Sequence, residues 1–149
     1  IVPRLRGNLS AVMSAVREVC PDVWHMRPDP DEWTPIEALC HLLDSEREVQ
    51  RPRLQTILND DNPFLGEPTP PPGPGKRACT VSATNVAYAF AEERLQTITL
   101  LDALDAAAWA RPARHSIFGP TTLLEMAEFT AQHDRMHLVQ LCQTVGKCS

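Results

Sequence analysis

The sequence lacks any apolar run long enough to cross a membrane, since none approaches the ~20 residues that a spanning helix needs. Its opening residues, Ile-Val-Pro-Arg-Leu-Arg, also lack the apolar stretch of a signal peptide. Positive charge is scarce as well, because 19 acidic residues outnumber 14 lysines and arginines and leave a formal net charge of -5. A continuous cationic surface for a phosphate backbone is therefore not expected. We predict a cytoplasmic protein that binds neither nucleic acid nor membranes.

Paired cysteine motifs are missing too. The five cysteines are odd in number and contain no CxxC pair: Cys20, Cys40, Cys79, Cys142 and Cys148. A disulfide framework more often has an even number of cysteines in a smaller secreted chain, so the sequence predicts reduced thiols. Cys40 precedes His41, but neighbouring helical side chains point ~100° apart and do not easily face one ion. A small buried apolar role is therefore favoured for Cys40 over that of a metal ligand.

What is present is the pattern of an all-α protein. The chain has 149 residues, of which 43% are apolar, and this suffices for a single domain over 1–149 with one contiguous core. Apolar residues recur at helical spacing in four segments, which proline-containing breaks separate: 2–20, 34–58, 81–104 and 122–145. We therefore predict four helices, and we expect Gly146 to end the last one.

The second helix has the clearest signals. In the run Thr34-Pro35-Ile36-Glu37, the threonine is a capping residue, the proline takes the first helical position and the glutamate takes the third. This run predicts the helix start and places His41 roughly two turns further on. Pro52 lies in the helix interior, where it is expected to kink the helix or shift its hydrogen bonding.

The segment 59–80 contains six prolines and three glycines. Such a composition argues against a helix or a central strand, and its ~20 residues exceed the usual connection between neighbouring antiparallel helices. One interpretation is a long crossover, which makes the second and third helices run parallel. A disordered surface insertion explains the same composition equally well.

Two histidines on the last helix carry the functional prediction. His133 and His137 are one turn apart, so both rings can reach the same ion. They share a helix face with Met126, Phe129, Thr130, Met136, Gln140 and Leu141. His41 lies at the polar edge of the second helix. A metal-binding triad is one interpretation, and the other is a pair of hydrogen-bonded core histidines with a solvated His41.

Two parts of the chain resemble a known family. The run Glu32–Arg47 (EWTPIEALCHLLDSER) resembles the second-helix signature of the DinB-like (YfiT-like) metal-binding four-helix proteins. The runs 118–123 (FGPTTL) and 131–141 (AQHDRMHLVQL) are similar to their last helix. The resemblance spans nearly the whole chain and implies a four-helix bundle in an up-down-down-up arrangement.

The same resemblance implies a metal centre. A divalent ion, often zinc or nickel in such proteins, is expected at the residues that match the family ligands, which are His41, His133 and His137. Phe129 and Met136 depart from the commonest pattern, in which relatives often have further histidines. Some members are thiol-dependent transferases or isomerases that use bacillithiol or mycothiol. We also expect a homodimer.

The ligand count predicts the chemistry. Three neutral imidazoles leave the ion its full charge and an open position, which lowers the pKa of a bound water or thiol toward neutrality. Candidates for a ligand-orienting residue or a general base are Asp44, Glu48 and Asp134. The alternative interpretation of each is a charged residue on a solvent-exposed helix surface. His115, in the break before the last helix, is expected at the surface. Three tryptophans are expected to anchor loops to the ends of the bundle: Trp24, Trp33 and Trp109.

The leading hypothesis is a metal-dependent enzyme that activates water or a small thiol in a hydrolase or transferase reaction on a small-molecule substrate. A second hypothesis is a non-catalytic metal-binding stress-response bundle, in which the ion stabilises the fold. A third is a helical module that dimerises through an outer face. A substrate-sized pocket beside the ion distinguishes the first hypothesis from the second.

Overall fold

A computed structural model describes residues 1–77, 79 and 81–149. Its longer helices are α1 (Val2–Glu18), α2 (Pro35–Ser45), α3 (Arg51–Asn59), α4 (Ala83–Asp102) and α6 (Leu123–Cys148). The shorter elements are the 3-10 turn η1 (Pro21–His25), the π-helical turn η2 (Glu46–Gln50), α5 (Ala106–Trp109), and the strands β1 (Phe64–Leu65), β2 (Pro112–His115) and β3 (Gly119–Thr122). None of the described helices combines the length and the apolar character that crossing a membrane requires.

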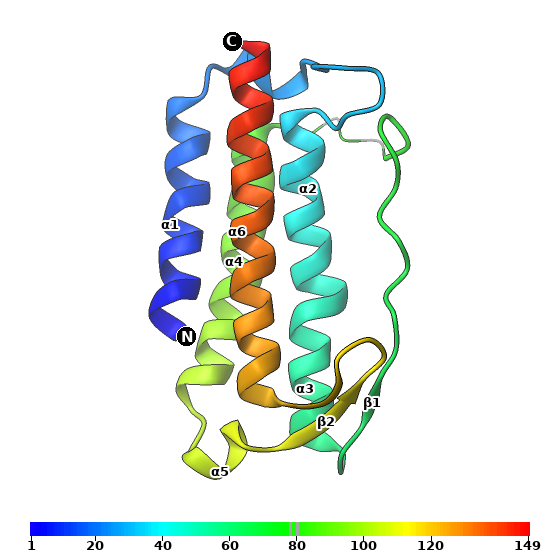
Figure 1. Cartoon of the computed structure of the whole chain (residues 1–149). Coiled ribbons are helices and arrows are strands. Elements are labelled where there is room, and N and C mark those ends of the chain that lie inside the picture. The colour runs from blue at the N-terminus through cyan, green and yellow to red at the C-terminus, as the bar shows by residue number, and fades with distance from the viewer. Residues whose placement is uncertain (78, 80) are drawn as a thin grey trace.

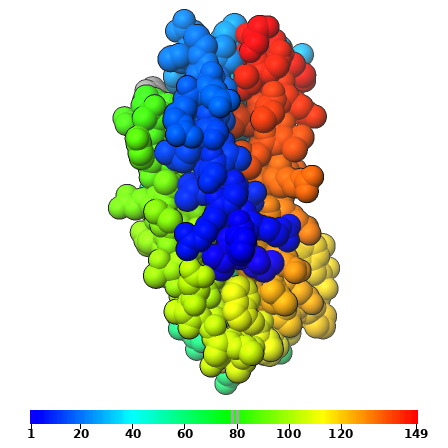
Figure 2. Space-filling model, turned by 90° about the vertical axis from the view of Figure 1, so that its left-hand side faces the viewer, coloured from blue at the N-terminus to red at the C-terminus, as the bar shows by residue number. Residues whose placement is uncertain are grey.

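Four helical rods form the bundle: α1, the continuous stretch α2–η2–α3, α4 and α6 (Figure 1). In Figure 1, α1 and α6 run in one direction along the bundle, and the other two rods run in the opposite direction. Figure 2 shows α1 lying between α4 and α6 on one face of the molecule. The predicted all-α four-helix bundle is confirmed.

The predicted start of α2 is confirmed. The Thr34 hydroxyl accepts a hydrogen bond from the Glu37 amide at 3.2 Å, and the Glu37 carboxylate accepts one from the Thr34 amide at 2.9 Å. The predicted effect of Pro52 is also confirmed, since the π-helical turn η2 immediately precedes α3, where Pro52 stands. Proline has no N–H to bond the carbonyl four residues earlier, so a widened turn accommodates it there.

The predicted end of the last helix is wrong, because α6 continues through Gly146 to Cys148. An interior glycine costs a helix only about 1 kcal/mol. Contacts of the neighbouring residues offset that cost: Val145 packs against the core, and Lys147 forms an ion pair with Glu32 at 2.8 Å.

The core consists of two apolar clusters with a polar layer between them. One cluster includes Leu39, Phe90 and Leu141, and the other includes Leu54 and Ile98. Both clusters contain residues from all four rods, so each cluster packs the four rods together at one level along the bundle.

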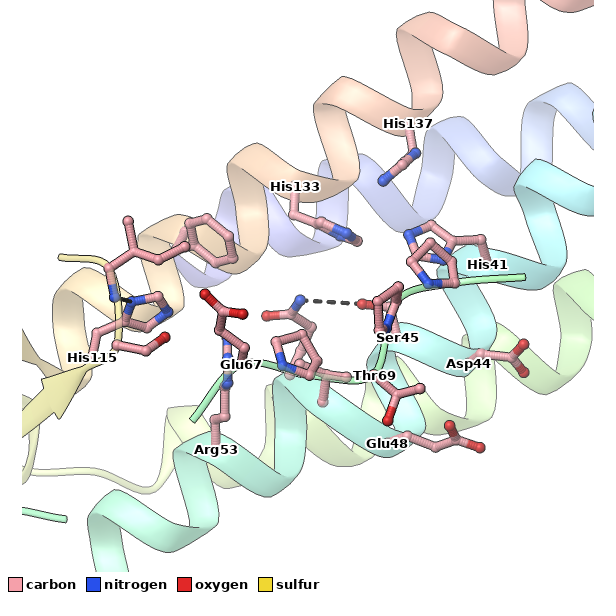
Figure 3. Close-up of a pocket in the computed structure, with 18 of the residues that line it drawn as sticks. His41, Asp44, Ser45, Glu48, Arg53, Glu67, Thr69, His115, His133 and His137 are labelled. Atoms are coloured by element: carbon pink, nitrogen blue, oxygen red, sulfur yellow. Dashed lines mark hydrogen bonds between the residues drawn. The ribbon is translucent and has the colours of Figure 1, made fainter. Parts of the chain in front are cut away.

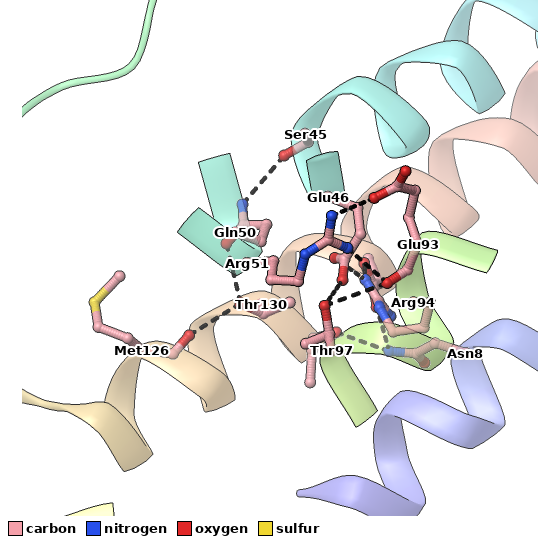
Figure 4. A network of polar contacts seen from close by, with 12 residues as sticks. Asn8, Ser45, Glu46, Gln50, Arg51, Glu93, Arg94, Thr97, Met126 and Thr130 are labelled. Atoms are coloured by element: carbon pink, nitrogen blue, oxygen red, sulfur yellow. Dashed lines mark hydrogen bonds and ion pairs between the residues drawn. The ribbon is translucent and has the colours of Figure 1, made fainter. Parts of the chain in front are cut away.

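The polar layer is centred on Arg94, whose side chain is almost fully buried (Figure 4). Its guanidinium donates to Glu46 of η2 at 2.7 Å and to Asp134 of α6 at 2.5 and 2.9 Å. Asn8 of α1 also donates to Asp134, and the Thr97 hydroxyl donates to Glu46. The layer therefore joins all four rods, and its paired charges offset the cost of their burial.

A small sheet closes one end of the bundle, where the sequence predicted only a break. β2 and β3 pair antiparallel, and Gly119 adopts a positive φ of 72° at the start of β3. β1 pairs with β2 in parallel, with Leu65 opposite His115. These strands have only two to four residues, too few for an alternating pattern to be recognised in the sequence.

The proline-rich segment between α3 and α4 follows the outside of α2–η2–α3 from one end of the bundle to the other (Figure 1). The indole of Trp33 donates to the Pro72 carbonyl at 3.1 Å, and the Gly75 amide donates to the Glu37 carboxylate at 2.7 Å. The described part is thus an ordered crossover, and the alternative of a disordered insertion is wrong for it. Residues 78 and 80 of the predicted segment lie outside the described residues.

The expectation that all five cysteines are reduced thiols is wrong. Cys40, buried in α2, forms a disulfide with Cys79, 39 residues later, near the end of the crossover. The crossover returns to the start of α2, and this return brings the two residues together. Neither an odd cysteine count nor a missing CxxC motif reveals such a long-range pair.

Candidate metal centre

Three histidines from two helices meet beside the polar layer. His41 comes from α2, and His133 and His137 come from successive turns of α6 (Figure 3). Each contributes a potential ligand nitrogen, and these atoms all lie within 4.8 Å of one another. The ring centroids are 4.4 Å apart for His41 and His137, 4.5 Å for His133 and His137, and 5.3 Å for His41 and His133. The structure thus brings together the three residues that were expected to form a triad.

The polar layer explains why His41 meets the other two. Arg94 binds Glu46, which directly follows α2, and Asp134, which is the neighbour of His133 in the chain. This double contact holds α2 and α6 side by side at one register. As a result, the polar edge of α2 that includes His41 faces α6, and His41 is partly buried instead of solvated.

Burial keeps two of the three rings neutral. It lowers the pKa of His41 to about 4, and the nearby rings of His137 and His133 lower it further, while Asp44 opposes the shift. The pKa of His133 is also lowered to about 4 by burial, with added effects of His137 and Arg94. At neutral pH these rings are uncharged, and a neutral imidazole is the form that binds a metal ion.

Hydrogen bonds around the rings fit a metal ligand set. Nδ1 of His137 lies 2.8 Å from the Gln140 side-chain oxygen, which can only accept, so Nδ1 carries a proton and Nε2 is the nitrogen left for a metal ion. Nδ1 of His133 is buried and has no hydrogen-bond partner in the described part of the chain. An orphaned buried nitrogen costs free energy, and coordination to an ion is one way to satisfy it.

Trp33 covers one side of the triad. Its ring lies 5.0 Å from the His41 ring and 6.1 Å from the His137 ring, measured between centroids. The sequence predicted Trp33 only as an anchor for a loop, which it also is through Pro72. Its contact with the triad depends on the path of the crossover and has no signal in the sequence.

A cavity of about 680 Å³ extends from the triad. Its walls are mainly apolar and include Ile117, Phe118, Phe129 and prolines of the crossover. A volume in the range of about 300–1,000 Å³ suits a small-molecule ligand. The three imidazoles therefore face a substrate-sized space.

A sequence model of the DinB superfamily matches residues 4–141 of the chain. The chain belongs to the DinB superfamily. Among solved structures, the fold of this DinB-superfamily chain matches YfiT from Bacillus subtilis with a TM-score of 0.78 and 16% sequence identity. The match covers 96% of this chain and 82% of that chain. YfiT is described as a probable metal-dependent hydrolase with an unusual four-helix bundle topology. The search of curated proteins finds no match to this sequence.

The three carboxylates predicted as orienting groups or bases have different surroundings in this DinB-superfamily fold. Asp134 is buried in the ion pair with Arg94 and is not among the residues that line the cavity. Asp44 lines the cavity but is held by two hydrogen bonds from Arg77, at 2.6 and 2.8 Å. Glu48 also lines the cavity and is exposed, although its carboxylate points away from the triad in Figure 3.

His115 is not at the surface as predicted. It stands in β2, is only 5% exposed and lines the cavity. The strand pairing explains this position, because the β2–β3 hairpin folds over the end of the bundle and turns His115 inward.

Met136 was predicted to share the inward face of α6, but it is 60% exposed because it lies at the edge of that face.

Sequence reasoning missed two charged residues of the cavity. Arg53 of α3 and Glu67 of the crossover both line it, and Figure 3 shows the Glu67 carboxylate pointing into the space between His115 and His133. Arg53 follows Pro52 in a helix of mixed polarity, and Glu67 lies in a segment without periodicity. Neither residue could be assigned to a face before the crossover was placed.

Proposed function

We propose that this protein binds a divalent metal ion through His41, His133 and His137 and hydrolyses a small molecule in the adjoining cavity. The observation that carries the proposal is the convergence of three imidazoles at the end of a substrate-sized cavity. Catalytic zinc sites use three protein ligands and keep one position open, whereas structural sites have four protein ligands. The cavity therefore favours an enzyme over an ion that serves only the fold. The description of YfiT as a probable metal-dependent hydrolase supports the same class.

A bound divalent ion supplies a Lewis acid that lowers the pKa of water toward neutrality. The residues of the chain prepare the site for it. His41 and His133 stay neutral because they are buried, and Gln140 fixes the His137 ring through Nδ1. Trp33 covers the triad on one side, so that a substrate approaches through the cavity.

Among the predicted bases, we retain Glu48 as the proton acceptor. Its carboxylate is exposed at the cavity wall and accepts no hydrogen bond within the part of the chain that the structure describes. A side-chain rotation is therefore unhindered by existing contacts. Asp44 instead serves to hold the crossover through Arg77. Asp134 is excluded from the role because Arg94 occupies both of its carboxylate oxygens.

Two finer points of the prediction are part of the proposal. Three neutral imidazoles suit zinc and nickel alike, so both ions are tested. A small thiol is an alternative nucleophile at the same open position, which would make the reaction a transfer and not a hydrolysis. The homodimer stays a prediction, and a mass measurement over a range of concentrations tests it.

Elemental analysis of protein purified without an affinity tag tests the metal proposal. We expect near-stoichiometric zinc or nickel in the parent protein and its loss in the His41→Ala and His137→Ala variants. The His25→Ala variant is a matched control, because His25 is exposed on η1 and outside the triad, and this variant should keep the metal. A parent protein that contains no metal and takes up neither added zinc nor added nickel overturns the proposal.

Hydrolysis of a panel of 4-nitrophenyl esters, with and without a chelator, tests the enzyme proposal. We expect activity in the metal-loaded parent protein that the chelator removes and added metal restores. The Glu48→Gln variant should keep its metal and lose most of this activity. A metal-loaded parent protein without activity, or with activity that the chelator leaves unchanged, contradicts the hydrolase assignment.

A further inference from the structure

Two hydrogen-bond donors, Arg53 and His115, line the end of the cavity that is farthest from His41 and His137 (Figure 3). Arg53 comes from α3 and His115 from β2, which are separated by the whole of the crossover and α4 in the chain. The charge of Arg53 influences the ionisation of His115, so the two groups lie within electrostatic reach of each other.

Backbone contacts fix the tautomer of His115. Its Nδ1 accepts hydrogen bonds from the amides of Ile117 at 3.0 Å and Phe118 at 3.2 Å. A nitrogen that accepts two N–H groups has no proton of its own, so the proton of the neutral ring is on Nε2. Burial and the charge of Arg53 lower the pKa of His115, Glu67 opposes them, and the net lowering favours this neutral form. His115 thus has one N–H group left for a ligand.

Arg53 forms no ion pair within the part of the chain that the structure describes. Its guanidinium donates to the Gly66 carbonyl at 2.8 Å, and no carboxylate of the described residues lies within ion-pair distance of it. Burial lowers the pKa of Arg53, because it removes water from the charge. A guanidinium has five N–H donors, so several remain for a planar acceptor.

The wall beside these donors is apolar and incompletely covered. Ile117 is 71% exposed and Phe118 is 52% exposed, although both line the cavity. Phe118 stacks on the His115 ring with 4.2 Å between centroids, which places an aromatic surface directly next to the donors. A ligand with an apolar body buries this surface when it fills the cavity.

We propose that Arg53 and His115 bind the carboxylate of a small molecule whose apolar body lies along Ile117 and Phe118. A carboxylate matches the fork geometry of a guanidinium and also accepts from the His115 Nε2–H. Its reacting group then lies at the triad, and this last placement alone rests on the proposed function. Glu67 also points into this space, so its carboxylate weakens binding of the ligand carboxylate and disfavours a second anionic group still more.

Binding of 4-phenylbutanoate and of 4-phenylbutanamide to chelator-treated protein tests the proposal by calorimetry. The metal-free protein is used because a carboxylate also binds a metal ion directly. We expect the acid to bind at least about tenfold more tightly than the amide, as for a charge-assisted pair. The Arg53→Gln variant should bind both ligands equally, and Arg53→Lys should keep part of the preference.

Two further variants sharpen the result. Arg47→Gln makes the same charge change at an arginine that pairs with Glu93 outside the cavity, so the preference for the acid should persist. Glu67→Gln removes a repulsive carboxylate and should strengthen binding of the acid but not of the amide. Equal binding of acid and amide, no binding of either, or an unchanged preference in Arg53→Gln overturns the carboxylate subsite. Zinc uptake, measured in the same variants, reports on the metal proposal separately.

Discussion

Replacement of Arg94 by methionine tests whether the buried polar layer holds the bundle together. Arg94, Glu46 and Asp134 have side chains that are 1%, 0% and 3% exposed, respectively. Methionine fills much of the arginine volume but leaves two carboxylates buried without a counter-charge. Removal of one partner from a buried ion pair typically costs about 3–5 kcal/mol. Because domains are stable by only about 5–15 kcal/mol, this is a large fraction of the total.

Urea denaturation followed by circular dichroism measures the effect. With a denaturant slope near 2 kcal/mol per M, the expected loss lowers the midpoint of the Arg94→Met variant by about 2 M.

A triple variant separates charge from packing. In Arg94→Met with Glu46→Gln and Asp134→Asn, no buried charge remains, and we expect recovery of at least about 2 kcal/mol relative to the single variant. Arg6→Met is the surface control, because the ion pair of Arg6 with Asp102 is about half exposed, and its loss should cost less than about 1 kcal/mol. A single variant as stable as the surface control, or a triple variant without recovery, would refute the role of the polar layer.

Three other predictions follow from the site and the crossover. In the metal-free protein, the unfolded chain binds more protons than the folded chain between pH 6.5 and 4, because folding lowers the pKa of His41 and His133 to about 4. The free energy of unfolding should therefore fall by about 2–3 kcal/mol per ring as the pH falls from 6.5 to 4. A variant with both rings replaced by glutamine should lack this pH dependence. Cys40→Ser should lower the free energy of unfolding by about 3–4 kcal/mol, as expected for a closed loop of this length, and a reducing agent should have no further effect on it. Gln140→Leu should weaken zinc affinity about tenfold or more in a chelator competition assay, and an unchanged affinity contradicts its role as an orienting residue.

Local signals were sufficient for most of the helical architecture. The capping box at Thr34 and Glu37 marks a helix start because both partners lie within four residues. The effect of Pro52 follows from a missing N–H group, which is a property of the residue itself. The end of α6 was mispredicted because Gly146 is outweighed by contacts of Val145 and Lys147 with segments far away in the chain.

The predictions for the candidate site also divide into those that depend on local contacts and those that depend on distant ones. His133 and His137 were paired correctly, because one helical turn separates them and no distant segment affects that geometry. Their meeting with His41 was reached only through family resemblance, since helical periodicity placed His41 at a polar edge that faces either solvent or a partner. The Arg94 layer decides between these two environments.

The sequence by itself determined the four helical rods, the start of α2, the break at 59–80 and the pairing of two histidines on one helix face. These features depend on interactions within one or two turns of the chain. Only the tertiary structure decided which face of α2 meets α6, which cysteines pair, that Arg53, Glu67 and His115 line the cavity, and that Trp33 covers the triad. Those residues come from segments whose relative positions depend on a buried ion network, a three-stranded sheet and a crossover. Such long-range contacts are selected by the packing of the whole bundle and leave no periodic trace in the amino-acid order.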